Sequence, residues 1–277
     1  MAKVIRHLRE EQKEFQKVFS GMCETKSSWQ VWADFVECAA ISISNAVDRD
    51  SKTSQEREAR YMQIMKTYRE AEQRCFGELF VIMAEALDAN PDQDFLGEMF
   101  MALELSNHWK GQFFTPYGVC RMMAAMQIGG AEDAIERRGW VGVMDPACGA
   151  GALLIAARNE FAQKEIGYLR TLFVCQDIDR VAALMCYIQL SLLGCAGYVV
   201  IADTICNPIV GGVAVIPVIK PDQDFWFMPM FYDEVWQDRI RFAALERAVK
   251  GMTQQLAEGQ EQPPELNTDA TGQLSFF

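Results

Sequence analysis

Three aspartates directly follow runs of apolar residues that read as β-strands, and a carboxylate at such a position can bind a cation or a hydroxyl group. They are Asp145 after 141–144, Asp177 after 171–176 and Asp203 after 198–202. In an alternating α/β fold these side chains share the carboxyl edge of a parallel sheet, where open sheets bind ligands. Aspartate also occurs at strand ends because it caps turns and helices. Three in series beside a glycine turn favour a binding site.

The first strand leads into that glycine turn, which opens a helix. Gly149, Ala150 and Gly151 leave no side chain to keep a ligand from the backbone, and residues 152–157 are strongly helix-forming. The Gly-Lys-Ser/Thr spelling of phosphate-binding loops is absent, and the turn has no basic residue. A neutral or cationic nucleoside therefore fits the turn better than a pyrophosphate.

Two motifs in this region carry a family resemblance. The run from Asp145 to Gly151, Asp-Pro-Ala-Cys-Gly-Ala-Gly, resembles the S-adenosylmethionine motif of N6-adenine DNA methyltransferases, especially the modification subunits of type I restriction systems. The run from Gly111 to Pro116, Gly-Gln-Phe-Phe-Thr-Pro, is similar to the motif that precedes it in those subunits, and 94–97 resembles their lead-in. The resemblance covers roughly 94–204. It implies a Rossmann-like class I methyltransferase fold, S-adenosylmethionine as cofactor and methyl transfer to adenine N6 in DNA within a restriction-modification system.

The resemblance also implies a cofactor site, residue by residue. Its members are Phe113, Phe114, Thr115, Asp145, Pro146, Ala147, Cys148, Gly149, Gly151, Asp177, Ile178 and Asp203. The aromatic pair and Thr115 would wrap the methionine and adenine ends, and Asp145 would lie near the ammonium. Asp177 would hold the ribose hydroxyls, Ile178 would pack on the adenine, and Asp203 would accept from its amino group. Carboxylates suit this cofactor because its sulfonium and ammonium are cations.

Cysteine and histidine usage excludes two other kinds of site. The nine cysteines contain no Cys-x-x-Cys pair, and His7 and His108 are the only imidazoles, so we expect no metal site. Cys148 lies in the glycine turn, but no histidine is nearby in sequence to activate it as a nucleophile. We interpret it as part of the cavity wall.

The catalytic motif of the resembled family is not spelled out in this chain. That motif, Asn/Asp-Pro-Pro-Tyr/Phe after a fourth strand, accepts the hydrogens of the target amine and stacks on the flipped base. Asn207-Pro208 supplies an amide and one proline but no aromatic, and it follows Asp203 closely. The run 228–231, Met-Pro-Met-Phe, follows a strand-like Asp-Phe-Trp-Phe segment but has a thioether where an acceptor oxygen is needed.

Several functions remain open on this basis. The chain is either an active methyltransferase with Asn207, Asp224 and Phe231 as catalytic candidates, or a cofactor-binding protein that has lost methyl transfer and acts as a structural or regulatory subunit. A class I methyltransferase with a non-DNA substrate and an acidic protein that imitates DNA are further alternatives.

Length and pattern predict three parts. Residues 1–92 read as an all-α N-terminal module, 93–258 as the methyltransferase-like domain with an incomplete sheet, and 259–277 as a polar tail. The N-terminal helical runs are 29–47 and 54–87, and a late helix spans 233–258. Residues 213–219 are a candidate edge strand because Pro217 interrupts them.

Charge and targeting signals bear on partners and location. The net charge of −12 predicts weak independent binding to DNA, because phosphate contacts require Lys and Arg. No segment is left for reading a DNA sequence, so a specificity or restriction-type partner subunit is expected, and a homo-oligomer stays open. Residues 1–20 are charged throughout, and no apolar run is long enough for a bilayer, which favours a cytoplasmic protein.

Overall fold

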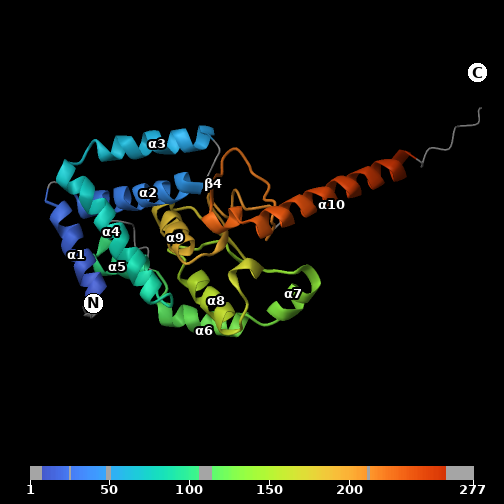
Figure 1. Cartoon of the computed structure of the whole chain (residues 1–277), viewed down its shortest axis with the longest axis horizontal. Coiled ribbons are helices and arrows are strands. Elements are labelled where there is room, and N and C mark those ends of the chain that lie inside the picture. The colour runs from blue at the N-terminus through green and yellow to red at the C-terminus, as the bar shows by residue number, and fades with distance from the viewer. Residues whose placement is uncertain (1–7, 25, 48–50, 106–113, 211–212, 260–277) are drawn as a thin grey trace, which may run out of the picture.

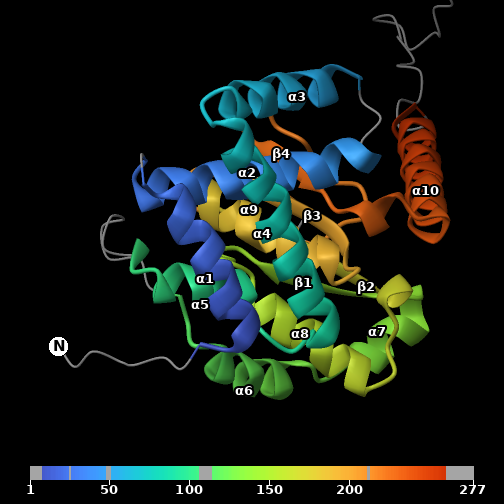
Figure 2. The same ribbon diagram turned by 60° about the vertical axis from the view of Figure 1, so that its left-hand side comes forward.

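The computed structural model in Figure 1 describes residues 8–24, 26–47, 51–105, 114–210 and 213–259. It is a mixed α/β structure in which helices outnumber strands. The helices gather around one small open sheet, and the last helix projects away from the rest of the chain (Figures 1 and 2).

The first five helices precede the sheet in the chain. They are α1 (Glu10–Met22), α2 (Ser28–Val47), α3 (Ser51–Met65), α4 (Glu70–Ala89) and α5 (Phe95–Ala102). The segment read as one helical run over 54–87 is two helices, α3 and α4. The chain turns between them because Tyr68 points inward, where its buried hydroxyl donates to Asp34 Oδ2 at 2.7 Å.

The sheet contains four strands in the order β1-β2-β3-β4. They are β1 (Val141–Asp145), β2 (Thr171–Asp177), β3 (Ala196–Ile201) and β4 (Asp224–Phe227). The first three are parallel, as the alternating pattern predicts, so their carboxyl ends share one edge. β4 runs antiparallel to β3, pairing Asp224 with Ile201 and Phe227 with Tyr198.

Helices connect and cover the parallel strands. α8 (Ala152–Gln163) joins β1 to β2 and α9 (Arg180–Leu192) joins β2 to β3, while α6 (Tyr117–Gln127) and α7 (Ala131–Arg138) precede β1. Asp179 caps α9, because its Oδ1 accepts from the Ala182 N–H at 2.7 Å.

One continuous core joins the N-terminal helices to one face of the sheet. Phe15, Trp32 and Phe95 belong to the same buried cluster as Leu154 of α8 and Phe173 of β2. The opposite face is covered differently. A second cluster there joins strand residues to residues of the loop before β4 and to α10 (Glu234–Gly259), including Leu172, Val174, Tyr198, Ile209, Val215 and Trp236.

The candidate strand over 213–219 is wrong, since this segment is irregular in the structure. Pro217 lacks an N–H for a ladder, and the segment instead lies over the second face of the sheet, where the Val213 side chain fills the space beside Gly142. Within the part of the chain that the structure describes, no helix has both the length and the apolar character required to span a bilayer.

Candidate functional site

The glycine turn follows β1 and is held against the end of β2. The Cys148 N–H donates to the Gln176 carbonyl at 3.0 Å, and the Gly151 N–H donates to the Cys148 carbonyl at 2.8 Å. Gly149 and Gly151 have positive φ angles of 53° and 94°. A Cβ at Gly151 would lie 2.9 Å from the Cys186 sulfur, so this position also requires glycine for close packing against α9.

Asp177 connects the end of β2 to this turn. Its Oδ2 accepts from the Gly149 N–H at 2.8 Å and its Oδ1 accepts from the Asp179 N–H at 2.9 Å. Each carboxylate oxygen can accept a second hydrogen bond. The side chain is 8% exposed, yet it lines a cavity. Asp177 is thus fixed in orientation and retains capacity for a ligand.

That cavity, which we call the turn cavity, has a volume of about 470 Å³ and lies over the glycine turn. Its lining residues are Phe114, Thr115, Cys120, Met123, Asp145, Ala147, Cys148, Gly149, Ala150, Ala152, Leu153 and Asp177. The Phe114 ring covers the turn, because a Cβ at Gly149 would lie 3.1 Å from it. Seven of the twelve residues expected at the cofactor site therefore line one cavity: Phe114, Thr115, Asp145, Ala147, Cys148, Gly149 and Asp177.

The other five expected residues are placed differently. Pro146 and Gly151 belong to the glycine turn without lining the cavity. Ile178 follows Asp177 and is 68% exposed. Asp203 caps its own turn, where its Oδ1 accepts from the Ile205 N–H at 2.8 Å and the Cys206 N–H at 3.0 Å. Phe113 lies outside the described residues.

The electrostatics of Asp145 and Asp203 differ. Burial raises the pKa of Asp145 above its usual value, a hydrogen bond from the Ala147 N–H lowers it, and nearby Asp177 raises it further. Hydrogen bonds from the Cys206 and Ile205 N–H groups lower the pKa of Asp203 instead. Asp145 is therefore a desolvated carboxylate whose charge a cation in the turn cavity would stabilise.

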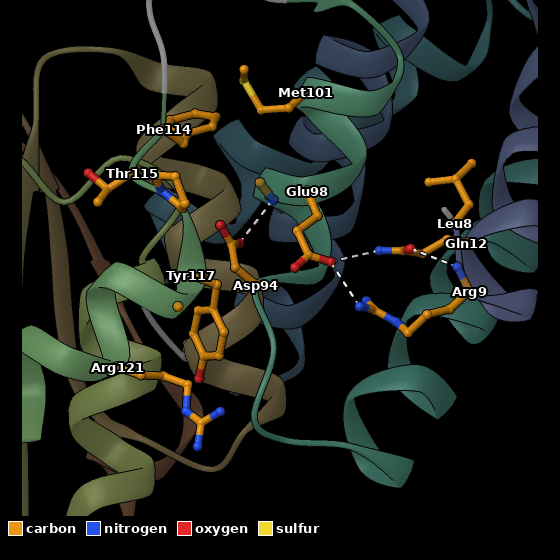
Figure 3. Close-up of a pocket in the computed structure, with 13 residues that line it drawn as sticks. Leu8, Arg9, Gln12, Asp94, Glu98, Met101, Phe114, Thr115, Tyr117 and Arg121 are labelled. Carbon is orange, nitrogen blue, oxygen red and sulfur yellow. Dashed lines mark hydrogen bonds and ion pairs between the residues drawn. The ribbon is translucent and has the colours of Figure 1, made fainter. Parts of the chain in front are cut away.

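A second cavity of about 420 Å³ lies on the other side of Phe114 and Thr115, between α1, α5 and the start of α6 (Figure 3). Two of its charged groups, Arg9 and Glu98, are paired with each other. Arg9 forms an ion pair with Glu98 at 3.0 Å, and Gln12 donates to the same carboxylate at 2.8 Å. Phe114 and Thr115 line both cavities.

Sequence reasoning missed a buried glutamine that joins the lead-in 94–97 to the glycine turn. Gln189 Nε2 donates to Asp94 Oδ1 at 2.8 Å and to the Ala150 carbonyl at 2.9 Å, and its Oε1 accepts from the Leu96 N–H at 3.0 Å. A Cβ at Gly97 would overlap the Asp94 carboxylate, which explains why the lead-in motif ends in glycine. The sequence signal for this role was the position of Gln189 in a mostly apolar helix.

A second buried glutamine, Gln176, organises the loop that contains Asn207. Its Nε2 donates to the carbonyls of Ala202 at 3.2 Å and Asn207 at 2.9 Å, and its Oε1 accepts from the Ile209 N–H at 3.1 Å. The amide of Asn207 is engaged within the same loop, because its Oδ1 accepts from Lys220 at 3.1 Å and from Gln223 at 3.3 Å.

The other catalytic candidates lie at two further places. Asp224 forms an ion pair with Arg180 at 2.6 Å and accepts from the Trp226 indole at 3.0 Å. Phe231 is buried beside Phe227, with ring centroids 5.3 Å apart. It lies beyond the amino end of β3 because β4 is antiparallel, and the Met228 N–H donates to the Gly197 carbonyl at 2.9 Å. The structure therefore separates Phe231 from Asn207 and Asp224 along β4, and none of the three lines the turn cavity.

Three thiols lie in or next to the glycine turn. Cys148, Cys175 and Cys186 are buried. The pKa of Cys148 is raised well above its usual value, mainly by a hydrogen bond with Cys186 and also by burial. Such a thiol is a packing group and a poor nucleophile. Among the residues with described positions, no group of three metal-ligating side chains could hold an ion.

Comparison with family models gives a match to part of the chain. No curated protein matches the chain at a significant level. The family model described as N-6 DNA methylase matches residues 92–227, from just before the lead-in motif to the end of β4. This match contains the glycine turn, Asp177 and all three parallel strands. Over these residues the chain is a member of the N-6 DNA methylase family.

Proposed function

We propose that this protein binds S-adenosylmethionine in the turn cavity. The observation that carries the proposal is the orientation of Asp177, which is fixed by the Gly149 and Asp179 N–H groups while it lines the cavity. Its carboxylate would accept from the ribose hydroxyls. Asp145 would lie near the cationic methionine end, and Phe114 and Ile178 offer apolar surface for the adenine. When bound, the cofactor supplies an electrophilic methyl group on sulfur.

We further propose that the chain alone does not transfer this methyl group. Transfer to adenine N6 requires acceptor oxygens that orient the amine toward the methyl and an aromatic ring that stacks on the base. Asn207 contacts Asp222 and Gln223, next to Asp224, whereas Phe231 follows the opposite end of β4, and none of the three candidates lines the turn cavity. Phe231 lies far from the turn cavity because β4 is antiparallel to β3. The antiparallel strand carries the chain away from the carboxyl edge of the sheet.

Two measurements test these proposals separately. Calorimetric titration with S-adenosylmethionine and S-adenosylhomocysteine should show one binding site per chain. Incubation with the tritiated cofactor and adenine-rich DNA should leave the DNA unlabelled. Absence of binding would refute the first proposal, and labelled DNA that disappears in the Asp177→Ala variant would refute the second.

A second candidate function is adenine methylation completed by a partner chain. In the described part of the chain, β1 pairs with β2 on one side and with no strand on the other. A cavity of about 300 Å³ runs along Val141–Asp145 and the facing side of α8. A strand added there in parallel would end beside the turn cavity, where an acceptor loop is needed.

The partner hypothesis predicts a conditional activity. A specificity or restriction-type subunit would supply the strand, the acceptor loop and the DNA contacts that the acidic chain lacks. Methyl transfer should then appear only in the mixture of this protein with its partner. Equal transfer by the partner alone would remove the basis for this function.

A further inference from the structure

The helix α10 has two opposite apolar faces, and only one of them packs on the body of the protein. The inner face contains Trp236, which is fully buried, and Ile240 and Ala243, which pack against the second core cluster. The outer face contains Phe242 and Leu245, which are 69% and 62% exposed. α10 projects beyond the sheet and the other helices (Figures 1 and 2), so the described remainder of the chain does not cover these two side chains.

The outer face follows the spacing of a coiled coil. Apolar residues alternate at steps of three and four along the helix, at 242, 245, 249, 252 and 256, where the sequence has Phe, Leu, Val, Met and Leu. This alternation assigns them to the a and d positions of a heptad repeat. The inner-face residues fall on b and f positions, which lie opposite the a and d seam. The part of the seam with described side chains, at 242, 245 and 249, therefore points away from the body.

From this arrangement we infer that α10 forms a parallel two-stranded coiled coil with α10 of a second copy of this chain. Charge complementarity selects this occupant. Arg241 occupies the g position before Phe242, and Glu246 occupies the e position after Leu245. In a parallel, in-register dimer each g residue faces the e residue five positions later in the partner helix. Arg241 of each chain then faces Glu246 of the other, and symmetry gives two such pairs.

The same two residues argue against an antiparallel pair of copies. In that orientation g positions face g positions and e positions face e positions, so arginine would meet arginine and glutamate would meet glutamate. Within one chain Arg241 forms an ion pair with Asp238 at 2.8 Å, and both side chains are mostly exposed. Surface pairs of this kind stabilise weakly and can be exchanged for a pair across the dimer. The seam is short, so the dimer dissociates on dilution.

Sedimentation of the full-length protein over a range of concentrations tests the inference. The mass should rise with concentration from the 31.3 kDa of one chain to twice that value. Leu245→Glu places a charge in the seam and should raise the dissociation constant by at least about tenfold. Ala244→Glu adds the same charge at the neighbouring exposed c position and should change it less than about twofold. A wild-type protein that stays at the mass of one chain, or equal effects of the two variants, would overturn the inference.

A charge-reversal cycle tests the parallel register. Arg241→Glu should weaken the dimer, because glutamate would then face Glu246 of the partner. Adding Glu246→Arg should restore it, since the pair is formed again with reversed polarity. Circular dichroism confirms that each variant is folded. Loss of the dimer in the single variant without recovery in the double variant would overturn the parallel arrangement. Cofactor binding is independent of this interface, so titration with S-adenosylmethionine should give the same affinity for every variant.

Discussion

The two ends of the sheet differ in how much of a methyltransferase site they assemble. At the carboxyl edge, Asp145 and Asp177 end neighbouring parallel strands, and both line the turn cavity with the glycine turn between them. At the amino end of β3, the Met-Pro-Met-Phe run follows an antiparallel strand and is packed into a hydrophobic cluster. Strand direction therefore separates the aromatic candidate from the turn cavity.

This contrast shows that a local motif and its position in a sheet are separate requirements. The glycine turn needs only the strand before it and the helix after it. A catalytic loop also needs its strand to end at the carboxyl edge of the sheet, beside the glycine turn. The run Asp-Phe-Trp-Phe does form a strand, yet its direction places Phe231 where it cannot contact a ligand of Asp177.

The largest expected effect that tests the difference between the two ends of the sheet is a loss of S-adenosylmethionine affinity at the carboxyl edge. Asp177→Ala should weaken S-adenosylmethionine binding about 100-fold, since it removes charge-assisted hydrogen bonds to the ribose. Calorimetry measures the affinity, and circular dichroism confirms the fold. Asp203→Asn is the matched control, because the Asp203 carboxylate is engaged by its own turn and its replacement should cost only a few-fold. If both variants lost the same affinity, the ribose assignment to Asp177 would be wrong.

A smaller effect is expected at the glycine turn. Gly149→Ala should reduce cofactor affinity about tenfold, because alanine strains a left-handed backbone and would displace the Phe114 ring. Gly130→Ala provides the control, since Gly130 has a similar positive φ of 76° but open space around it. Both variants should lose comparable stability in urea unfolding. Reduced affinity in both would show that the ring contact at Gly149 has no role.

The sequence predicted the parallel strands and the glycine turn around the turn cavity because the sequence signals for these features are local. The three parallel strands and the glycine turn depend on residues close in the chain, and family membership through residues 92–227 was expected from two motifs. Cofactor binding itself stays a prediction, as does the division of the chain at residue 92.

The remaining features depend on contacts between distant residues, which one sequence does not display. The placement of β4 is one such feature. Its Trp226 ring stacks with the guanidinium of Arg57 in α3, 3.9 Å from the ring centroid, and these two residues are far apart in the sequence. The roles of Gln176 and Gln189 are others, because each buried amide joins segments far apart in sequence. The prediction of an edge strand at 213–219 was wrong for the same reason, because the apolar residues of this segment cover a face of the sheet.

A pH dependence should distinguish the two ends of the sheet further. The pKa of Asp145 is raised chiefly by burial, so in the free protein its ionised form is disfavoured. A cationic ligand favours the ionised form, so affinity for S-adenosylmethionine should fall several-fold as pH drops through the raised pKa of Asp145.

Asp145→Asn isolates this carboxyl group. The variant should bind more weakly at neutral pH and lose the acid dependence. It should also be more stable than the wild type at neutral pH, because the stability tied to protonated Asp145 is present at low pH and lost as pH rises through its folded pKa. Calorimetry in buffers of decreasing pH measures the first effect, and urea unfolding measures the second. An unchanged pH profile in the variant would assign the titration to another group.

The smallest expected effect concerns the ion pairs that hold β4. Arg180 bridges Glu37 of α2 at 2.8 Å and Asp224 of β4 at 2.6 Å. Arg180→Ala should lower the free energy of unfolding by about 1 kcal/mol, since the groups are partly exposed and screened. Arg74→Ala, which removes an exposed pair with Glu70, should change it by less than about 0.5 kcal/mol. Hydrogen exchange at the β4 amides should accelerate in Arg180→Ala alone, with cofactor affinity unchanged. A loss of affinity would instead show that the β4 end of the sheet and the cofactor edge are coupled.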